Sequence, residues 1–205
     1  MTNTPDSHPK VSATTRAMVG GSTLVVLVAA LTADRLSKSW ALTALAEGET
    51  IPLLPGVQLQ LAFNPGAAFG MGAAFGPVMA IGILVLLLSL SSWIFWCIAR
   101  GTANWSLLLL TAAAGGGWGN MYDRISRADG VALSGTVVDM IAVDWFAIFN
   151  VADIFAVGGI AGWAFTRLIR RRPETKRATE GEPVRPPSRA RLQIHSSREP
   201  PRHTR

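Results

Sequence analysis

The chain of 205 residues is poor in the side chains on which many hydrolases and metalloproteins depend. Cys97 is its only cysteine, so neither an intrachain disulfide nor a cysteine-based metal cluster is possible. The three histidines, His8, His195 and His203, lie in the polar ends of the chain. A zinc protease and a Ser-His-Asp triad both need histidine in the folded domain. These absences argue against both classes, and we expect no metal and no cofactor.

Charged side chains are also scarce, at 16% of the residues, whereas hydrophobic residues make up 49%. Soluble domains average about 25% charged residues. Four apolar runs are long enough, at about 1.5 Å per residue, to cross a hydrocarbon core of about 30 Å. They cover residues 17–33, 77–99, 105–121 and 146–169. We therefore predict a mainly α membrane protein with four transmembrane helices, the first retained rather than cleaved as a signal peptide.

Positive charge gathers at one side of this predicted topology. The last 39 residues hold 12 Lys and Arg against 4 Asp and Glu, whereas the rest of the chain is slightly acidic. Lys10, Arg16 and Arg100 fall on the same side as this tail if the chain crosses four times. The positive-inside rule then predicts that both termini are cytoplasmic. We expect the basic tail to touch membrane lipids rather than nucleic acid.

The same topology divides the chain into three parts. We expect residues 1–16 to be a disordered cytoplasmic N-terminus, 17–170 the four-helix membrane domain and 171–205 a disordered basic tail. Within the membrane domain, segments 34–76 and 122–145 are predicted to be extracytoplasmic. These two outer segments and the adjoining helix ends hold nearly all the polar residues of interest.

One stretch of the first outer segment alternates between apolar and polar side chains. Val57, Leu59, Leu61 and Phe63 point to one side of an extended chain, and Asn64 falls on the other. Prolines precede the stretch and Asn-Pro-Gly follows it. The pattern predicts a short strand in a small extracytoplasmic β-sheet, with Asn64 on its polar face.

Two aspartates stand out because apolar sequence surrounds them. Asp139 ends the run Gly-Thr-Val-Val-Asp, and Asp153 lies inside the fourth apolar run. A charge in a membrane segment costs about 2.5–3.5 kcal/mol on insertion scales, so it usually has a functional reason. Two neighbouring carboxylates that share one proton can act as general base and general acid. Asp139 and Asp153 are therefore the candidate catalytic pair.

The other candidate site residues are polar side chains at the outer ends of the predicted helices and of the strand. They are Asp34, Lys38, Asn64, Asn120, Asp123, Arg124 and Asn150. Several are three or four residues apart, a spacing that places side chains on one helical face. The amides can hold the carboxylates or a water, and an Asp–Arg neighbourhood can clamp a backbone carbonyl. Residues 115–119, which are rich in glycine, are expected to serve close helix packing.

Spacing alone leaves three interpretations of these residues open. An aspartic peptidase and a proton-coupled transporter would both use paired carboxylates, and a structural scaffold would use neither. A transporter would carry polar residues across the membrane to the cytoplasmic side. The second apolar run and the inner half of the fourth offer almost none, which favours the peptidase.

Five sequence blocks carry a resemblance to a known family. In order, they are DRLSK from Asp34, FNPGAAF from Phe63, GGWGNMYDR from Gly116, VVD ending at Asp139 and FNVAD ending at Asp153. Together they resemble the signature of bacterial lipoprotein signal peptidase (signal peptidase II) over about residues 17–170.

The resemblance implies an aspartic endopeptidase of the bacterial cytoplasmic membrane. Its substrates would be prolipoproteins that already carry diacylglyceryl, cut just before the lipidated cysteine at the outer face of the membrane. Asp139 and Asp153 would be the catalytic pair. Asn64, Asn120, Arg124 and Asn150 would line or support the site, and Asp34, Lys38 and Asp123 would have supporting roles. One chain supplies every expected part, so we expect a monomer.

Overall fold

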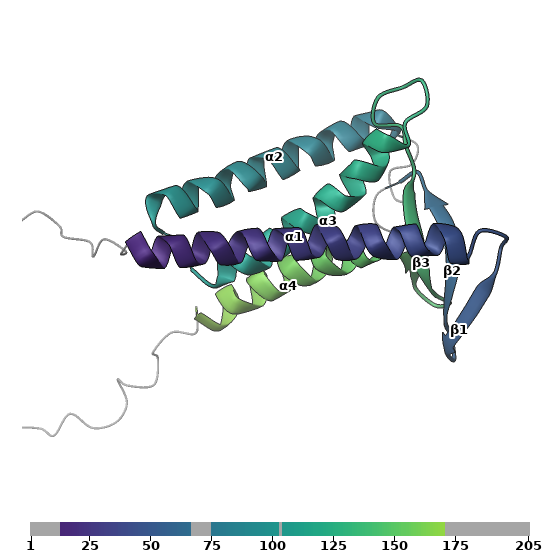
Figure 1. Cartoon of the computed structure of the whole chain (residues 1–205), viewed down its shortest axis with the longest axis horizontal. Coiled ribbons are helices and arrows are strands. Elements are labelled where there is room, and N and C mark those ends of the chain that lie inside the picture. Colours follow the sequence, from purple (N-terminus) through teal and green to yellow (C-terminus); the bar gives the residue numbers. More distant parts are fainter. Residues whose placement is uncertain (1–12, 67–74, 103, 171–205) are drawn as a thin grey trace, which may run out of the picture. The chain divides into compact units, whose positions relative to one another are not determined.

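The computed structural model describes residues 13–66, 75–102 and 104–170. The predicted disorder of residues 1–12 and of the tail 171–205 concerns residues outside these ranges. The described elements are α1 (Ala13–Ala44), β1 (Thr50–Leu54), β2 (Val57–Asn64), α2 (Pro77–Arg100), α3 (Ser106–Ser126), β3 (Val137–Val143), β4 (Ala147–Phe149) and α4 (Val151–Arg170). The four strands form one sheet at the end of the helices where α1 and α3 contact β3 (Figure 1). The predicted class, a mainly α membrane protein with a small sheet, is confirmed.

Helix α1 is longer at both ends than the predicted run of residues 17–33. It begins at Ala13, so residues 13–16 are helical and not part of a disordered terminus. It ends at Ala44, so the predicted outer segment 34–76 starts as helix.

A buried ion pair explains why α1 continues past its apolar run. The Lys38 ammonium lies 2.9 Å from a carboxylate oxygen of Asp34, one helical turn earlier, and both side chains are buried. Ala41 extends the same buried face. A run defined by hydropathy stops at the first charge, whereas the helix continues because the charges neutralise each other inside the fold.

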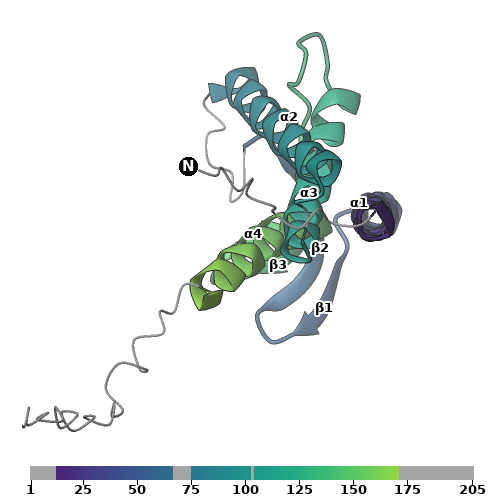
Figure 2. The same ribbon diagram turned by 90° about the vertical axis from the view of Figure 1, so that its left-hand side faces the viewer.

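Within the described residues, three helices are long and apolar enough to cross a membrane: Ala13–Ala44, Pro77–Arg100 and Val151–Ile169. Helix α3 is not apolar enough to be among them, because its leucine-rich first half is followed by small and polar residues. Figure 2 shows α3 between the other three helices, and it packs against each of them. Much of its surface therefore meets protein rather than lipid, which lowers the need for apolar side chains. A fourth membrane crossing, by α3, stays a prediction.

Glycines let α3 and α4 approach closely. A Cβ added at Gly116 would collide with the carbonyl oxygen of Ala152 in α4. One added at Gly159 in α4 would collide with the carbonyl oxygen of Leu109 in α3. The predicted packing role of the glycine-rich residues 115–119 is confirmed, because neighbouring helices occupy the space a side chain would need.

The sheet is antiparallel throughout, in the order β1-β2-β3-β4. Strand β2 confirms the strand predicted from alternation at residues 57–63. In the β2–β3 ladder, Ala62 lies opposite Asp139 and Asn64 lies opposite Val137. Because Asn64 is two residues beyond Ala62, its side chain shares a face with that of Asp139. The pairing thus links two segments that are far apart in the sequence.

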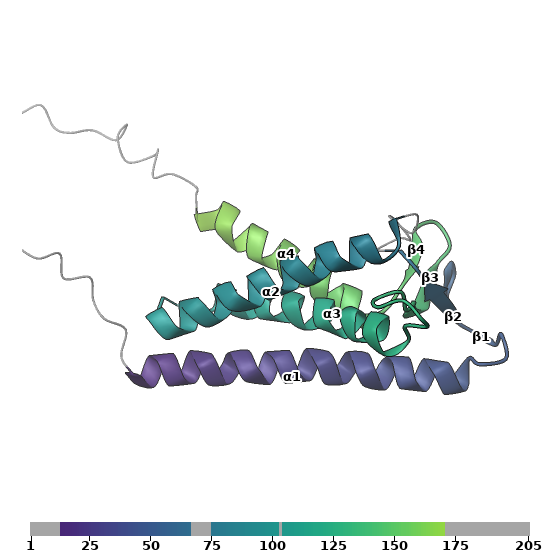
Figure 3. The same cartoon turned by 90° about the horizontal axis from the view of Figure 1, so that it is seen from above.

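Strands β3 and β4 were not predicted. The sequence pattern indicates no strand in the outer segment 122–145, but β3 covers Val137–Val143. Residues 146–149 were expected to open the fourth helix, but Ala147–Phe149 is strand β4, and α4 begins only at Val151 (Figure 3). A continuous apolar run of aromatic and β-branched residues fits a buried strand as well as a helix, so periodicity could not place this boundary.

The sheet is fixed to α1 by a small apolar cluster. Ala41 and Leu45, at the end of α1, pack with Val138 and Met140 of β3, and all four are buried. Asp139 lies between the two β3 members of this cluster in the sequence, so its side chain points to the opposite face of the strand. Packing on one face of β3 therefore holds the position of the carboxylate on the other.

Candidate active site

Asp139 lies on β3, where its side chain is almost completely buried, at 2% exposed. Two amides hold its two carboxylate oxygens. Asn64 Nδ2 on β2 donates to Oδ2 at 3.0 Å, and Asn150 Nδ2 donates to Oδ1 at 2.6 Å. Because both partners donate, they stabilise the ionised carboxylate and fix its plane.

Asp153 lies in the first turn of α4, where Asn150 caps the helix. The Asn150 side-chain oxygen accepts a hydrogen bond from the Asp153 backbone N–H at 3.0 Å. In return, the Asn150 backbone N–H donates to Asp153 Oδ2 at 3.2 Å. This reciprocal arrangement is a capping box with Asn and Asp. Asn120 Nδ2 of α3 donates to the other oxygen, Oδ1, at 2.8 Å.

The two carboxylates come together around Asn150. Its side-chain amide donates to Asp139 and its backbone N–H donates to Asp153. In space, the two acids therefore lie on either side of the single residue Asn150. Both acids line one cavity of about 100 Å³, with Asn64, Asn120 and Arg124 among its other walls. A water molecule occupies about 30 Å³ in the liquid, so the cavity has room for one between the carboxylates.

A buried charge network holds Asn120. Lys38 Nζ lies 2.9 Å from a carboxylate oxygen of Asp34 and 2.9 Å from one of Asp123. It also donates to Asn120 Oδ1 at 2.7 Å, and the same oxygen accepts from Asn150 Nδ2 at 3.1 Å. With its oxygen held by two donors, the Asn120 amide must direct its nitrogen to Asp153.

Arg124 fixes the backbone around the cavity. Its guanidinium donates to the carbonyl oxygens of Pro65 at 3.3 Å and Gly135 at 3.5 Å, and to that of Gly66. The predicted clamp on a backbone carbonyl is therefore confirmed. The neighbouring Asp123 carboxylate accepts a hydrogen bond from the Val138 backbone N–H at 3.2 Å, next to Asp139. Two adjacent side chains of α3 thus hold the backbone just before Asp139, at Gly135 and Val138.

Burial sets the protonation of Asp139. It raises the pKa of this carboxyl to about 6, because the charged form loses contact with water. The hydrogen bonds from Asn64 and Asn150 lower the pKa, and the nearby charge of Asp153 raises it. A carboxyl with a pKa near neutrality can both hold and release a proton under working conditions.

The structure brings all nine predicted site residues together at one end of the helices. Their catalytic and supporting roles stay predictions. The sequence pattern did not predict the contact of Gly135, whose carbonyl oxygen accepts a hydrogen bond from Arg124. An added Cβ at Gly135 would lie 2.8 Å from the backbone carbonyl oxygen of Arg124. The sequence pattern also missed Arg35, which lies 3.6 Å from Asp123 and 4.1 Å from the centroid of the Tyr122 ring. In the sequence Arg35 directly follows Asp34, and nothing in this position indicates a contact with Asp123 or Tyr122.

Known proteins resemble this chain in sequence and in fold. A family model described as Signal peptidase (SPase) II matches residues 26–169. The chain is 39% identical over 145 residues to the lipoprotein signal peptidase of Bifidobacterium adolescentis, covering 70% of this chain and 73% of that one. It is 38% identical over 140 residues to the lipoprotein signal peptidase of Mycobacterium tuberculosis, covering 66% of this chain and 65% of that one.

Two solved structures share the fold. A bacterial membrane enzyme solved by the in meso method at 2.3 Å superposes with a TM-score of 0.61 at 20% identity, covering 77% of this chain and 93% of that chain. A second, solved at 1.9 Å, gives a TM-score of 0.57 at 22% identity, with 74% and 94% covered. The family match covers α2 and α3, the second part of α1 and nearly all of α4, and it includes both candidate acids. The chain therefore belongs to the signal peptidase II family.

Proposed function

We propose that Asp139 and Asp153 are the catalytic dyad with which this aspartic peptidase removes signal peptides from prolipoproteins. One observation carries the proposal. The two carboxylates, from β3 and α4, hydrogen-bond to the same Asn150 and line the same cavity. Two acids this close cannot both ionise cheaply, so the pair retains one proton over a range of pH.

The shared proton allows hydrolysis without a metal or a covalent intermediate. The ionised carboxylate takes a proton from a water in the cavity, and the water oxygen attacks the scissile carbonyl carbon. The protonated carboxyl donates its proton to the carbonyl oxygen as this carbon becomes tetrahedral. When the C–N bond breaks, the proton taken from water passes to the leaving nitrogen. At the same time one hydroxyl of the tetrahedral carbon returns its proton to the carboxylate that had protonated the carbonyl oxygen. The other hydroxyl stays on the new carboxyl group, and the dyad is back at its starting protonation.

The surrounding amides keep the acids in position for these transfers. Asn64 and Asn150 hold Asp139, and Asn120 holds Asp153, so each carboxylate enters the reaction with a fixed orientation. Arg124 supports the loop backbone beside them. In this proposal the buried charged residues act indirectly, by fixing Asn120 and the start of β3. They are Asp34, Lys38 and Asp123.

The substrate is proposed to be a prolipoprotein whose cysteine already carries diacylglyceryl. Its acyl chains would stay in the bilayer while the peptide bond before the cysteine reaches the helix end that holds the dyad. Arg16, Arg100 and Arg167 lie at the opposite ends of their helices. The positive-inside rule then places the dyad at the outer face of the cytoplasmic membrane and both termini in the cytoplasm. A single chain would suffice, because it supplies every residue of the site.

Substitution of each acid tests the proposal. Purified full-length Asp139→Asn and Asp153→Asn variants are incubated with diacylglyceryl-modified prolipoprotein, and cleavage is followed by gel shift. Each variant is expected to lose about 10²–10⁴-fold of the rate. The matched control is Asp144→Asn, in the turn between β3 and β4, which is expected to cut at the wild-type rate.

The substrate assignment has its own test. The wild-type protein is expected to cut the lipidated precursor and to leave the same precursor intact when it lacks diacylglyceryl. Either acid variant cutting at near wild-type rate would remove that residue from catalysis. Equal cutting of both precursors would overturn the lipid requirement while leaving the dyad in place.

A further inference from the structure

A second cavity lies at the opposite end of the helices from the dyad. It has a volume of about 240 Å³ and is bounded by α2, α3, α4 and the link between α2 and α3. Three tryptophans, Trp93, Trp96 and Trp163, form much of its wall. Pockets for drug-sized ligands measure about 300–1,000 Å³, so this one suits a smaller chemical group.

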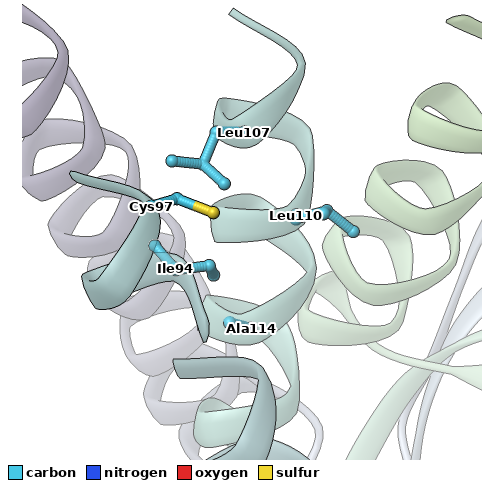
Figure 4. Close-up of a cluster of buried hydrophobic side chains, with 5 residues drawn as sticks. All are labelled: Ile94, Cys97, Leu107, Leu110 and Ala114. Atoms are coloured by element: carbon cyan, nitrogen blue, oxygen red, sulfur yellow. The ribbon is translucent and has the colours of Figure 1, made fainter. Parts of the chain in front are cut away.

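An apolar cluster closes the inner side of this cavity. Cys97 and Leu107 line it and belong to the buried cluster with Ile94, Leu110 and Ala114, whose side chains Figure 4 shows on α2 and α3. Trp163 of α4 packs against the same cluster. The cavity is therefore part of a fixed helix interface.

Three nitrogen-bearing side chains of the cavity, those of Asn104, Trp163 and Arg167, can donate hydrogen bonds to an occupant. Trp163 Nε1 is buried and, among the described residues, is the one buried side-chain nitrogen without a hydrogen-bond acceptor. Arg167 lines the cavity, and its guanidinium lies 5.4 Å from the centroid of the Trp163 ring. Asn104 Oδ1 already accepts from the Ser106 backbone N–H, at 3.0 Å, and from its hydroxyl. The amide nitrogen of Asn104 is thus the group left to donate.

No acidic side chain is among the residues that line the cavity. Two more arginines lie near it at the same end. Arg100 lies 5.2 Å from the centroid of the Trp96 ring, and Arg16 of α1 lies against Gly101, where an added Cβ would be 2.6 Å from its Nε. An occupant must therefore supply negative charge and acceptor oxygens. A phosphate ester meets both needs.

Membrane depth identifies the source of such a phosphate. Arg167 is 14 residues beyond Asp153, or about 21 Å along the axis of α4, so the cavity lies towards the other membrane face. Trp93 and Trp96 are 40% and 49% exposed in α2, which is long and apolar enough to cross a membrane, so their open faces would meet lipid. Tryptophan and arginine at this level are typical of the head-group region, where anionic lipids gather.

We infer that this cavity binds the head group of an anionic phospholipid. Trp163 Nε1 and the Arg167 guanidinium donate to the phosphate oxygens, and the open tryptophan faces contact the upper part of the acyl chains. The site is separate from the dyad, so the inference does not depend on the proposed catalysis.

Lipid retention by the full-length protein in detergent tests the inference. Native mass spectrometry measures binding of phosphatidylglycerol and phosphatidylcholine offered in equal amounts. The wild-type protein is expected to retain one phosphatidylglycerol in preference to phosphatidylcholine. Trp163→Phe, which keeps an aromatic ring and changes no charge, is expected to weaken phosphatidylglycerol binding about tenfold, and Arg167→Gln at least as much.

Arg127→Gln is the matched control, because Arg127 also lies over an aromatic ring, 5.7 Å from the centroid of Phe63, but at the end of α3 that holds the site. It is expected to leave retention within twofold of wild type. Equal retention of the two lipids by the wild-type protein would overturn the inference, and this arm needs no variant to fold. Unchanged retention in Trp163→Phe, or an equal loss in Arg127→Gln, would show diffuse attraction only. Full competition by glycerol 3-phosphate would assign the cavity to a free phosphoester.

Discussion

Lys38→Met removes the one cation that, in the described part of the chain, contacts three site-supporting side chains at once. The Lys38 ammonium lies 2.9 Å from Asp34, 2.9 Å from Asp123 and 2.7 Å from the Asn120 oxygen, and its side chain is 2% exposed. Methionine has a similar length and no charge. The substitution therefore leaves the packing nearly unchanged but strands two buried carboxylates.

Stranding a buried charge costs about 3–5 kcal/mol of folding free energy. Arg35 compensates little, because it lies 3.6 Å from Asp123 with its own side chain 49% exposed, so solvent weakens the attraction. For a chain of this size each kcal/mol shifts the melting temperature by about 2–4 °C. Lys38→Met should therefore melt about 6–20 °C below wild type in the same detergent.

Activity should fall independently of this loss of stability. Without the ammonium on its oxygen, the Asn120 amide can turn and withdraw its nitrogen from Asp153. A hydrogen bond to a charged group contributes about 1.5–3 kcal/mol, so the cleavage rate per folded molecule should drop about 10–100-fold. Gel-shift cleavage, normalised to the folded fraction from thermal unfolding, measures this drop.

A matched variant and a double variant make the test specific. Arg35→Met removes another cation near Asp123, but this one is half exposed. The free energy of unfolding of this variant should therefore lie within about 1 kcal/mol of the wild-type value. Lys38→Met combined with Asp34→Leu removes a charge together with its partner and should recover part of the lost stability. A Lys38→Met variant that melts within about 2 °C of wild type and cuts normally would refute the reasoning.

Two further predictions follow from burial and from close packing. The Asp139 carboxyl has a pKa of about 6 when folded, against 3.8 as its ordinary value, so the folded protein holds the extra proton between these values. Stability should therefore fall by about 2–2.5 kcal/mol as the pH rises from 4 to 7. Asp139→Asn lacks this fall, and parallel thermal-unfolding profiles for the two proteins over that range would contradict the prediction. In α4, Gly159→Ala collides with the Leu109 carbonyl oxygen and should cost about 1–3 kcal/mol, whereas an added Cβ at Gly158 meets nothing within 4 Å and Gly158→Ala should be neutral or stabilising. Equal melting temperatures for the two alanine variants would count against the close approach of α3 and α4.

The site residues could be predicted because polar groups in apolar surroundings need partners. Asp153 lies in an apolar run, and Asn120 and Asn150 are among the few nearby side chains able to hold it. The requirement that buried charges be hydrogen-bonded therefore identified donors along with acids. The contacts between Asn120, Asn150 and the two aspartates follow this logic.

The contacts that depend on tertiary structure could not be predicted in the same way. The sequence places Arg124 at the outer mouth, but it does not say which carbonyls the guanidinium meets, because Pro65 and Gly135 are brought there by the sheet and the loop. The sequence also did not predict that α1 extends to Ala44, for a similar reason. Its extension depends on Asp123, from α3, sharing the ammonium of Lys38.

The unpredicted strand β4 determines how close the two acids lie. Had the helix started at residue 146, Asp153 would lie about 10 Å along its axis, and Asn150 would be inside the helix and unable to cap it. Instead, β4 pairs with β3 so that Phe149 lies opposite Ile141, and the chain returns along β3. In an antiparallel ladder the next residue, Asn150, then arrives level with the β3 residue beside Asp139. The hairpin thus brings the capping residue of α4 to the strand acid, and the cap sets the helix acid in the first turn. Any change that lets residues 146–149 become helical should therefore separate the pair, even with both aspartates intact.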